Sequence, residues 1–540
     1  MTNAIRIAIL LSVFSVLVLA GAEALAATSY YVDAMRGSDA YSGTLAQPWR
    51  TFRHALDRLA PGDTLFVRQG NYRPEGVIPI RLLGEPGSPI RIAAFQEERP
   101  QVLSLSVRDS AWLEISGLSL EGPETLPAGW RDMPEVVIDN PSVSIDPAQK
   151  WRLGRETKVR EKYRSYVHFW DWEKRGSAGL LVAASRDVVL RDNDIARHAV
   201  GIRLKDGAVR VIVEHNRIHH AYDAIDGGYG RSSVSFEECV IRNNVIRQIY
   251  REGIRLSGLA RRNIVESNDI RHTGHSHIAT YAAGGGNVIR GNSVRFGGYY
   301  TETMRAPGSS GISIHSAGPG TRVEGNTVAY QYDGGSRRDG NGIISDFNPD
   351  GAFIVNNVIY RVAGSGVSSV HSGNNLIAYN TIVEAGHDGQ SRSNGVAIKL
   401  FARQDINNII VGNIIYHPRL GGIHAENTSL GEQRLIDHNL FDLLPGTAFA
   451  GSGLGRKGIL FDLADYRRTG HDAHAVVGDP RFVNGGTENF HLQATSPAIG
   501  AGMPAHAPAR DRDGVPRHSR QPAIGAYEYR PLSGGAAGDN

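Results

Sequence analysis

One short motif recurs through the middle of this 540-residue chain: an Asn followed two residues later by Ile, Val or Phe. Its ten copies are spaced 23 to 34 residues apart and begin at Asn193, Asn216, Asn244, Asn268, Asn292, Asn326, Asn357, Asn380, Asn413 and Asn439. A second signature, Gly followed by Ile or Val, lies between most copies, at Gly201, Gly253, Gly311, Gly342, Gly366, Gly395 and Gly422. Such repetition indicates a solenoid built from stacked units.

The repeats contain strand and turn residues, without the spacing of an amphipathic helix or the Leu frame of a leucine-rich repeat. Such a unit predicts one coil of a parallel β-helix, in which coils stack at about 4.8 Å, the spacing of hydrogen-bonded strands. The Ile and Val side chains would point inward, and the Asn side chains would form an internal ladder at one corner. We therefore expect an all-β fold, a parallel β-helix of about ten or more coils.

The segments on either side of the repeats differ from them. Residues 28–120 are predicted to form an N-terminal cap and the first coils, with a helical segment from Thr51 to Leu59 that covers the open end. Residues 121–176 are an insertion that contains four of the six tryptophans. Residues 177–445 form the central β-helix, and 446–540 form a closing segment and tail, in which 478–529 closes the stack.

The two ends of the chain resemble those of a known family. The opening is YYVDAMRGSDAYSGTLAQPWRTFRHALDRLAPGDTLFVRQGNYRPEG at 30–76, and the ending includes SPAIGAG and AIGAYEY. Both resemble the ends of exported right-handed parallel β-helix proteins of the pectate-lyase-like polysaccharide lyase superfamily. The resemblance covers nearly the whole mature chain, and it implies a right-handed coil and activity on carbohydrates.

Composition and the N-terminus indicate an exported globular protein. The net charge of +3 lacks the strong positive excess of nucleic-acid-binding proteins. Arg6 precedes an apolar run from Ile7 to Leu19 and an Ala-Leu-Ala sequence at 24–26, the pattern of a secretory signal peptide over residues 1–27. We expect a periplasmic or secreted protein without a membrane span after cleavage. The single cysteine, Cys239, excludes an internal disulfide and is expected to be buried.

Outward-facing side chains of the coils supply the candidate catalytic residues. When the coils are aligned on this Gly position, residues two and four positions after it share one face, because successive residues of a strand alternate between faces. The middle of this face carries Arg255, Tyr281, His315 and Asp346. We expect His315 to act as base, with Asp346 orienting it and Tyr281 as acid or partner. Arg255 is expected to neutralise a substrate carboxylate.

The same alignment and two long loops supply substrate-binding candidates. Lys399, four residues after Gly395, would lie in line with His315 and Asp346. The loops at 296–311 and 331–342 lengthen their repeats and would wall this face. The full set of binding candidates is Arg203, Lys205, Asp226, His371, Lys399, Tyr299, Tyr300 and Arg305.

We assign no residue as a metal ligand from the sequence. Calcium remains open, because Asp223 and Asp226 offer carboxylate oxygens. His272, His275 and His277 have a spacing that could bring imidazoles together on zinc, without an adjacent acidic cluster.

The residues and the resemblance together favour a polysaccharide lyase that cleaves an acidic, uronate-containing polysaccharide by β-elimination and acts as a monomer. A uronate C5-epimerase would use the same first proton abstraction. A glycoside hydrolase would need clustered carboxylates instead. A non-catalytic protein for exopolysaccharide binding or assembly would use the same groove without turnover.

Overall fold

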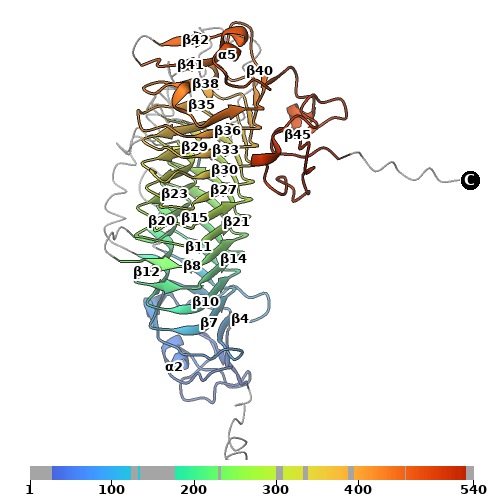
Figure 1. The fold of residues 1–540 in the computed structure, drawn as a ribbon. Coiled ribbons are helices and arrows are strands. Elements are labelled where there is room, and N and C mark those ends of the chain that lie inside the picture. Colours follow the sequence, from blue (N-terminus) through green and yellow to red (C-terminus); the bar gives the residue numbers. More distant parts are fainter. Residues whose placement is uncertain are drawn as a thin grey trace, which may run out of the picture.

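The computed structural model describes residues 27–122, 132–133, 177–228, 233–299, 308–332, 339–386, 395–455 and 458–530. Within these residues the chain winds into one elongated stack of coils, and each coil contributes strands to long parallel sheets (Figure 1). The expected all-β parallel β-helix is thereby confirmed. The signal peptide and most of the 121–176 insertion lie outside the described residues.

Three sheets, called A, B and C here, form the walls of the stack. The strands of sheet A, in their order of pairing, are β1 (Ser29–Val32), β2 (Thr64–Val67), β4 (Ile90–Ala94), β7 (Ala111–Ser116), β10 (Arg186–Arg191), β14 (Ile212–Glu214), β18 (Val240–Arg242), β21 (Ile264–Glu266), β24 (Val288–Arg290), β27 (Arg322–Glu324), β30 (Phe353–Val355), β33 (Leu376–Ala378), β36 (Ile409–Val411) and β39 (Leu435–Asp437). In addition, β13 (Ala208–Val209) pairs with β10, and β17 (Phe236–Glu237) pairs with β13.

Sheet B forms the second wall. Its strands are β5 (Gln101–Val102), β8 (Ser119–Glu121), β11 (Asp194–Ala196), β15 (Arg217–Ala221), β19 (Val245–Ile249), β22 (Asp269–Thr273), β25 (Ser293–Gly297), β28 (Thr327–Gln331), β31 (Val358–Tyr360), β34 (Thr381–Val383), β37 (Ile414–Tyr416), β40 (Leu440–Asp442) and β43 (Val476–Val477).

Sheet C forms the third wall and carries the candidate site. Its strands are β3 (Val77–Ile80), β6 (Ser104–Arg108), β9 (Ala178–Ala183), β12 (Val200–Lys205), β16 (Asp223–Asp226), β20 (Ile254–Ser257), β23 (Ile278–Tyr281), β26 (Ser310–His315), β29 (Asn341–Asp346), β32 (Val367–Val370), β35 (Val396–Leu400), β38 (Gly421–Ala425), β41 (Ala448–Ser452) and β42 (Ile459–Phe461).

Branched apolar side chains fill the interior of the stack in register. One column of sheet C runs Ile202, Ile225, Ile254, Ile278, Ile312, Ile343, Val367, Ile398 and Ile423. All of these side chains are buried. Residues on either side of this column point outward, so the register of the core fixes which side chains form the outer face.

The predicted asparagine ladder is confirmed. Asn244 is typical: its backbone N–H and its Nδ2 both donate to Oδ1 of Asn268, at 3.0 and 2.9 Å. The ladder ends on a residue that the motif did not include, because Asn439 donates to Oδ1 of Asp472 at 3.1 Å. Cys239 is buried as expected, and its N–H donates to Asn263 Oδ1 at 2.9 Å in a second, shorter series of such bonds.

Short helices lie at the two ends of the stack (Figure 1). Helix α2 (Phe52–Leu56) is shorter than the predicted segment, and the Thr51 side chain accepts a hydrogen bond from the N–H of His54. At the other end, β42 pairs antiparallel with β41, and helix α5 (Leu463–Arg468) follows it. Single-turn helices are η1 (Arg73–Glu75), η3 (Leu430–Glu432), η4 (Gly485–Thr487) and η5 (Pro504–His506).

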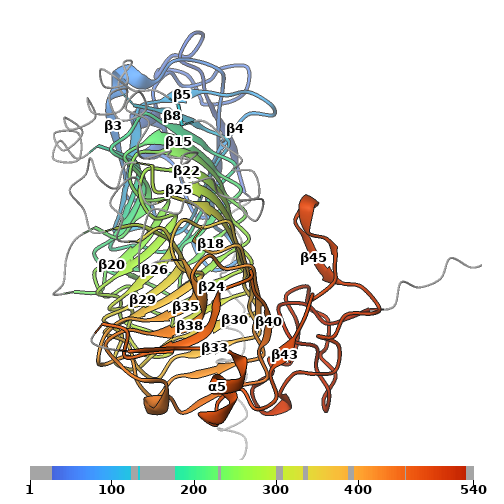
Figure 2. The same cartoon turned by 90° about the horizontal axis from the view of Figure 1, so that it is seen from above.

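The prediction that residues 478–529 close the end of the stack is wrong. This segment, with the hairpin β44 (Phe482–Asn484) and β45 (Asn489–Leu492), lies along the side of the stack (Figures 1 and 2). Phe490 and Tyr527 pack there with Tyr330 and Tyr360, which point outward from sheet B. Those aromatic rings explain the placement, because they form an apolar surface that the segment covers.

Candidate functional site

Three predicted catalytic residues end neighbouring strands of sheet C. Tyr281 on β23 is the register partner of His315 on β26, which is in turn the partner of Asp346 on β29. The ring centroids of Tyr281 and His315 are 5.7 Å apart. The structure thus brings the three residues together on the outer face, with His315 in the middle, and their catalytic roles remain a prediction.

An exposed aromatic ring borders this group. The ring of Phe347 lies 5.3 Å from that of His315 and 4.6 Å from that of His371, measured between centroids. The rings of Phe347 and His371 are stacked, with 12° between their planes. Half of the Phe347 side chain is exposed, at 50%. Such a ring next to polar groups suits the apolar face of a sugar.

Two carboxyl groups near this face have raised pKa values. Burial raises the pKa of Asp346 to about 6, although the charge of His371 opposes the shift. Burial also raises the pKa of Asp339 to about 6, and the charge of Asp346 adds to this shift. A carboxyl group with such a pKa can hold and release a proton near neutral pH. Asp339 was not predicted, although it lies in the 331–342 loop that the sequence marked.

Arg255 cannot play its predicted role. Its side chain is 2% exposed, and its guanidinium donates to Asp226 Oδ2 at 2.7 Å. The same guanidinium lies 3.3 Å from Asp223 Oδ2 and 3.3 Å from Glu252 Oε2. The prediction that Arg255 neutralises a substrate carboxylate is therefore wrong, because buried carboxylates already balance its charge. Removing one member of such a network would leave an uncompensated buried charge. The role of Arg255 is therefore structural.

The calcium and zinc interpretations find no support at their predicted residues. Asp226 is held at both oxygens by Arg203, at 2.8 and 3.0 Å, and Asp223 Oδ1 accepts from Arg251 at 2.9 Å. Guanidinium groups thus occupy the oxygens that calcium would need. His272, His275 and His277 face three different partners, which are respectively the ring of Phe296, the carboxylate of Glu252 and the carbonyl of Arg295.

Lys399 lies in a different column from the predicted one. It is the register partner of Ser368 and His424, two residues out of line with His315. Ala397 occupies the position of Gly366 in this coil, so Gly395 was the wrong anchor. Lys399 is buried, with Nζ 3.3 Å from Glu426 Oε1, and burial lowers its pKa.

The other binding candidates are dispersed. Lys205 Nζ lies 3.2 Å from the Asp206 carboxylate, far along sheet C from His315. The ring of Tyr299 lies 5.2 Å from that of Tyr332. Two further candidates, Tyr300 and Arg305, lie outside the described residues.

A cavity of 610 Å³ lies between sheet B and the C-terminal segment. Its lining includes Tyr360, Arg361, Glu384, Arg481 and Glu488. The sequence did not predict it, because 478–529 was assigned to the end of the stack. The cavity is on a different wall of the stack from His315. Two of its charged residues, Arg361 and Glu384, form an ion pair with each other.

Comparison with known proteins agrees with this architecture. A family model described as the right handed beta helix region matches residues 178–343. The chain is a right-handed parallel β-helix protein. In sequence, 97 residues are 28% identical to the uncharacterized protein YwoF of Bacillus subtilis (strain 168). The match covers 16% of this chain and only 20% of that relative, about a fifth of its length.

Solved structures with a similar course of the chain include enzymes of two kinds. Pectate lyase Pel9A is 12% identical, with a TM-score of 0.43, and the match covers 93% of this chain and 96% of that one. The PL6 family alginate lyase AlyGC is 15% identical, with a TM-score of 0.41 and coverage of 90% and 59%. The GH136 lacto-N-biosidase from Eubacterium ramulus is 13% identical, with a TM-score of 0.39 and coverage of 78% and 66%.

At these identities the likeness concerns the fold alone, and a fold does not determine the reaction. Among the described residues, no helix is both long enough and apolar enough to span a bilayer.

Proposed function

We propose that this protein is an exported carbohydrate-active enzyme that cleaves a uronate-containing polysaccharide by β-elimination on the outer face of sheet C. The observation that carries the proposal is the position of His315 between Tyr281 and Asp346 on successive paired strands. An imidazole is a suitable base near neutral pH, and a rigid sheet holds its neighbours in fixed positions. Export is supported by the signal-like sequence at 1–27.

The reaction needs a base, an acid and a group that holds the substrate carboxylate, and three side chains of this face can supply them. His315 would take the proton from C5 of the uronate, and the C4–O4 bond would break as the C4=C5 bond forms. Asp346, protonated in part because its pKa is about 6, would give its proton to the leaving O4. The imidazole of His371, stacked on Phe347, would replace Arg255 as the group that faces the substrate carboxylate and donates a hydrogen bond to it.

Tyr281 would position the base rather than serve as the acid. Burial and the neighbouring Glu252 raise the pKa of Tyr281 well above its usual value, so that its phenol holds its proton firmly. Its ring lies beside the imidazole of His315.

A glycoside hydrolase on the same face is the second candidate. Two carboxyl groups support this candidate. The pKa values of Asp339 and Asp346 are both about 6, and the charge of Asp346 helps to raise the pKa of Asp339. A glycosidase uses two carboxyl groups, one of which carries a proton at the working pH.

The test is incubation of the protein with alginate, pectate, glycosaminoglycans and bacterial exopolysaccharides, with ultraviolet absorbance and reducing ends followed together. We expect an increase in absorbance, because β-elimination conjugates the new double bond with the carboxylate. His315→Gln should lower kcat about 10²- to 10⁴-fold, the usual contribution of a general base. His518→Gln, at an exposed His far along the chain, is the matched control and should leave the rate unchanged.

Each other outcome points to a different reaction. Reducing ends without absorbance, lost in Asp339→Asn and Asp346→Asn, would indicate the hydrolase. A changed uronate composition without cleavage would indicate an epimerase. Binding of a polysaccharide without any product, unaffected by His315→Gln, would refute catalysis at this face.

A further inference from the structure

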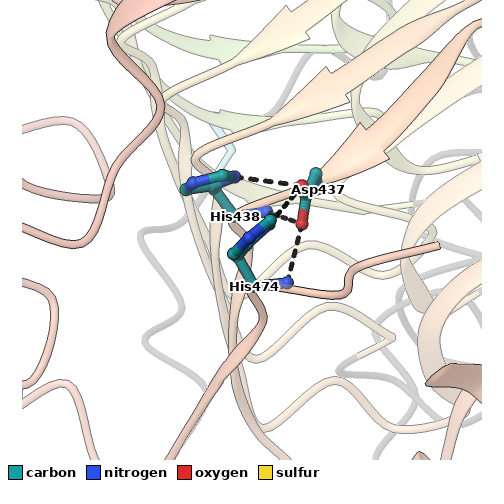
Figure 3. A group of neighbouring side chains, drawn as sticks. All are labelled: Asp437, His438 and His474. Atoms are coloured by element: carbon teal, nitrogen blue, oxygen red, sulfur yellow. Dashed lines mark hydrogen bonds and ion pairs between the residues drawn. The ribbon is translucent and has the colours of Figure 1, made fainter. Parts of the chain in front are cut away.

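A His–Asp group with no assigned role lies near the C-terminal end of the stack, on a different wall from His315. Asp437 is the last residue of β39 in sheet A, and His438 follows it with a left-handed φ of 56°. His474 comes from the segment between α5 and β43. Figure 3 shows the two imidazoles side by side, both facing the Asp437 carboxylate.

The three side chains converge closely. Asp437 Oδ2 lies 2.7 Å from His474 Nδ1 and 3.3 Å from His438 Nδ1. One ligand atom from each residue lies within 4.8 Å of the others. Zinc binds nitrogen and oxygen ligands at about 2.0–2.2 Å, so small side-chain rotations would bring all three onto one ion.

The backbone holds the carboxylate in place for this purpose. Asp437 Oδ1 accepts from the N–H groups of His438 and His474, at 2.8 and 2.9 Å. Oδ2 is therefore the oxygen that faces the imidazoles. The adjacent rung of the ladder joins β39 to the segment that carries His474, since the N–H of Asn439 donates to Asp472 Oδ1 at 3.1 Å. Ligands oriented in this way by surrounding hydrogen bonds are typical of protein metal sites.

We propose that Asp437, His438 and His474 bind one divalent transition metal ion of the zinc class, which fastens the segment carrying His474 to the last coil. Two imidazoles and one carboxylate select such a metal over calcium or magnesium, which prefer oxygen ligands. The His474 side chain is 66% exposed, so water can complete the coordination. This inference does not depend on the proposed reaction, because the site is on another wall of the stack.

The test is titration of the metal-free full chain with Co²⁺, followed by its visible absorption, and with Zn²⁺, followed by calorimetry. We expect one ion per chain and a tetrahedral or five-coordinate Co²⁺ spectrum. His474→Ala should weaken metal binding at least about 100-fold, because it removes a ligand. Loss of a residue that only hydrogen-bonds a ligand typically weakens binding by about 10- to 100-fold. Since His474 is exposed, this variant should fold normally. Hydrogen exchange of residues 470–478 should slow when Zn²⁺ is added to the wild type only.

The matched control is His491→Ala, which removes an exposed His that lies 2.8 Å from the carboxylate of Asp513. It should bind Co²⁺ like the wild type. Asp437→Asn should keep the fold and lose most of the affinity. Failure of the wild type to bind one ion, or equal binding by His474→Ala, would overturn the proposal.

Discussion

At the residue scale, the asparagine ladder places polar side chains inside an apolar stack without leaving their groups unsatisfied. Each rung offers one oxygen to two donors of the preceding coil, its backbone N–H and its side-chain amide. An apolar residue at a rung would therefore leave the backbone N–H of its neighbour buried and unpaired. Such groups cost about 1–3 kcal/mol each.

We expect Asn268→Ala to lower the free energy of unfolding by about 3 kcal/mol. The backbone N–H of Asn244 would lose its acceptor, and the carbonyls of Ile241 and Glu266 would lose the Asn268 amide that donates to them. Urea unfolding followed by circular dichroism measures this loss. Asn71→Ala, at an exposed Asn, is the control and should change stability by less than about 0.5 kcal/mol. Equal stability of the two variants would show that the hydrogen bonds of the ladder do not contribute to the free energy of unfolding.

The ladder was predictable from the sequence because its residue type is invariant from coil to coil. His315 and Asp346 were placed correctly for a related reason, since each lies four residues after a Gly of the second signature. Tyr281 lies four residues after His277, which stands in the position of that Gly in its coil. Lys399 was misplaced because Ala397 takes the position of that Gly in its coil. Arg255 was misassigned because sequence spacing gives a face but does not reveal partners such as Asp223 from another coil.

At the element scale, the hairpin β44–β45 is held to sheet B by one acidic side chain. Arg295 Nη1 donates to Glu488 Oε2 at 2.6 Å, and the hydroxyl of Tyr330 donates to Oε1 at 2.5 Å. The hydroxyl of Tyr360 also donates to Glu488. The sequence could not predict this docking, because the outward Tyr and Arg side chains belong to repeats far from Glu488.

Glu488→Ala should loosen the hairpin while the coils remain intact. Arg295 would lose its ion pair and the two hydroxyls would lose their acceptor, at a cost of about 1–3 kcal/mol. We expect faster hydrogen exchange in residues 482–492 and unchanged exchange in β25 and β28. Glu85→Ala, at an exposed Glu, serves as the control. Unchanged exchange in the hairpin would show that apolar packing of Phe490 suffices to hold it.

At the scale of the whole molecule, the buried titratable groups act on stability in opposite directions. Burial lowers the pKa of each of three imidazoles, His198, His277 and His424, to about 4. The unfolded chain binds protons at these residues below pH about 6.5, so their contribution to stability is lost as the pH falls towards 4. Asp339 and Asp346, with pKa values of about 6, bind protons more tightly in the fold, so their contribution is lost as the pH rises from about 4 to 6.

Because the His and Asp contributions oppose each other, the stability of the wild type should depend only weakly on pH. A single-site variant is needed to separate the two contributions. His277 is fully buried, and its Nε2 donates to the carbonyl of Arg295 at 2.8 Å. His277→Gln should be less stable than the wild type at pH 7.5, because the imidazole packs and bonds in its neutral form. Between pH 7.5 and 4.5 the difference should shrink by about 2–3 kcal/mol, since only the wild type must keep this imidazole neutral.

Urea midpoints of both proteins at the two pH values measure this change. A constant difference for His277→Gln would mean that its imidazole is protonated within the stack. The Arg295 carbonyl and a buried negative charge would then have to hold an imidazolium, and the interior of the β-helix would be more polar than its apolar columns indicate.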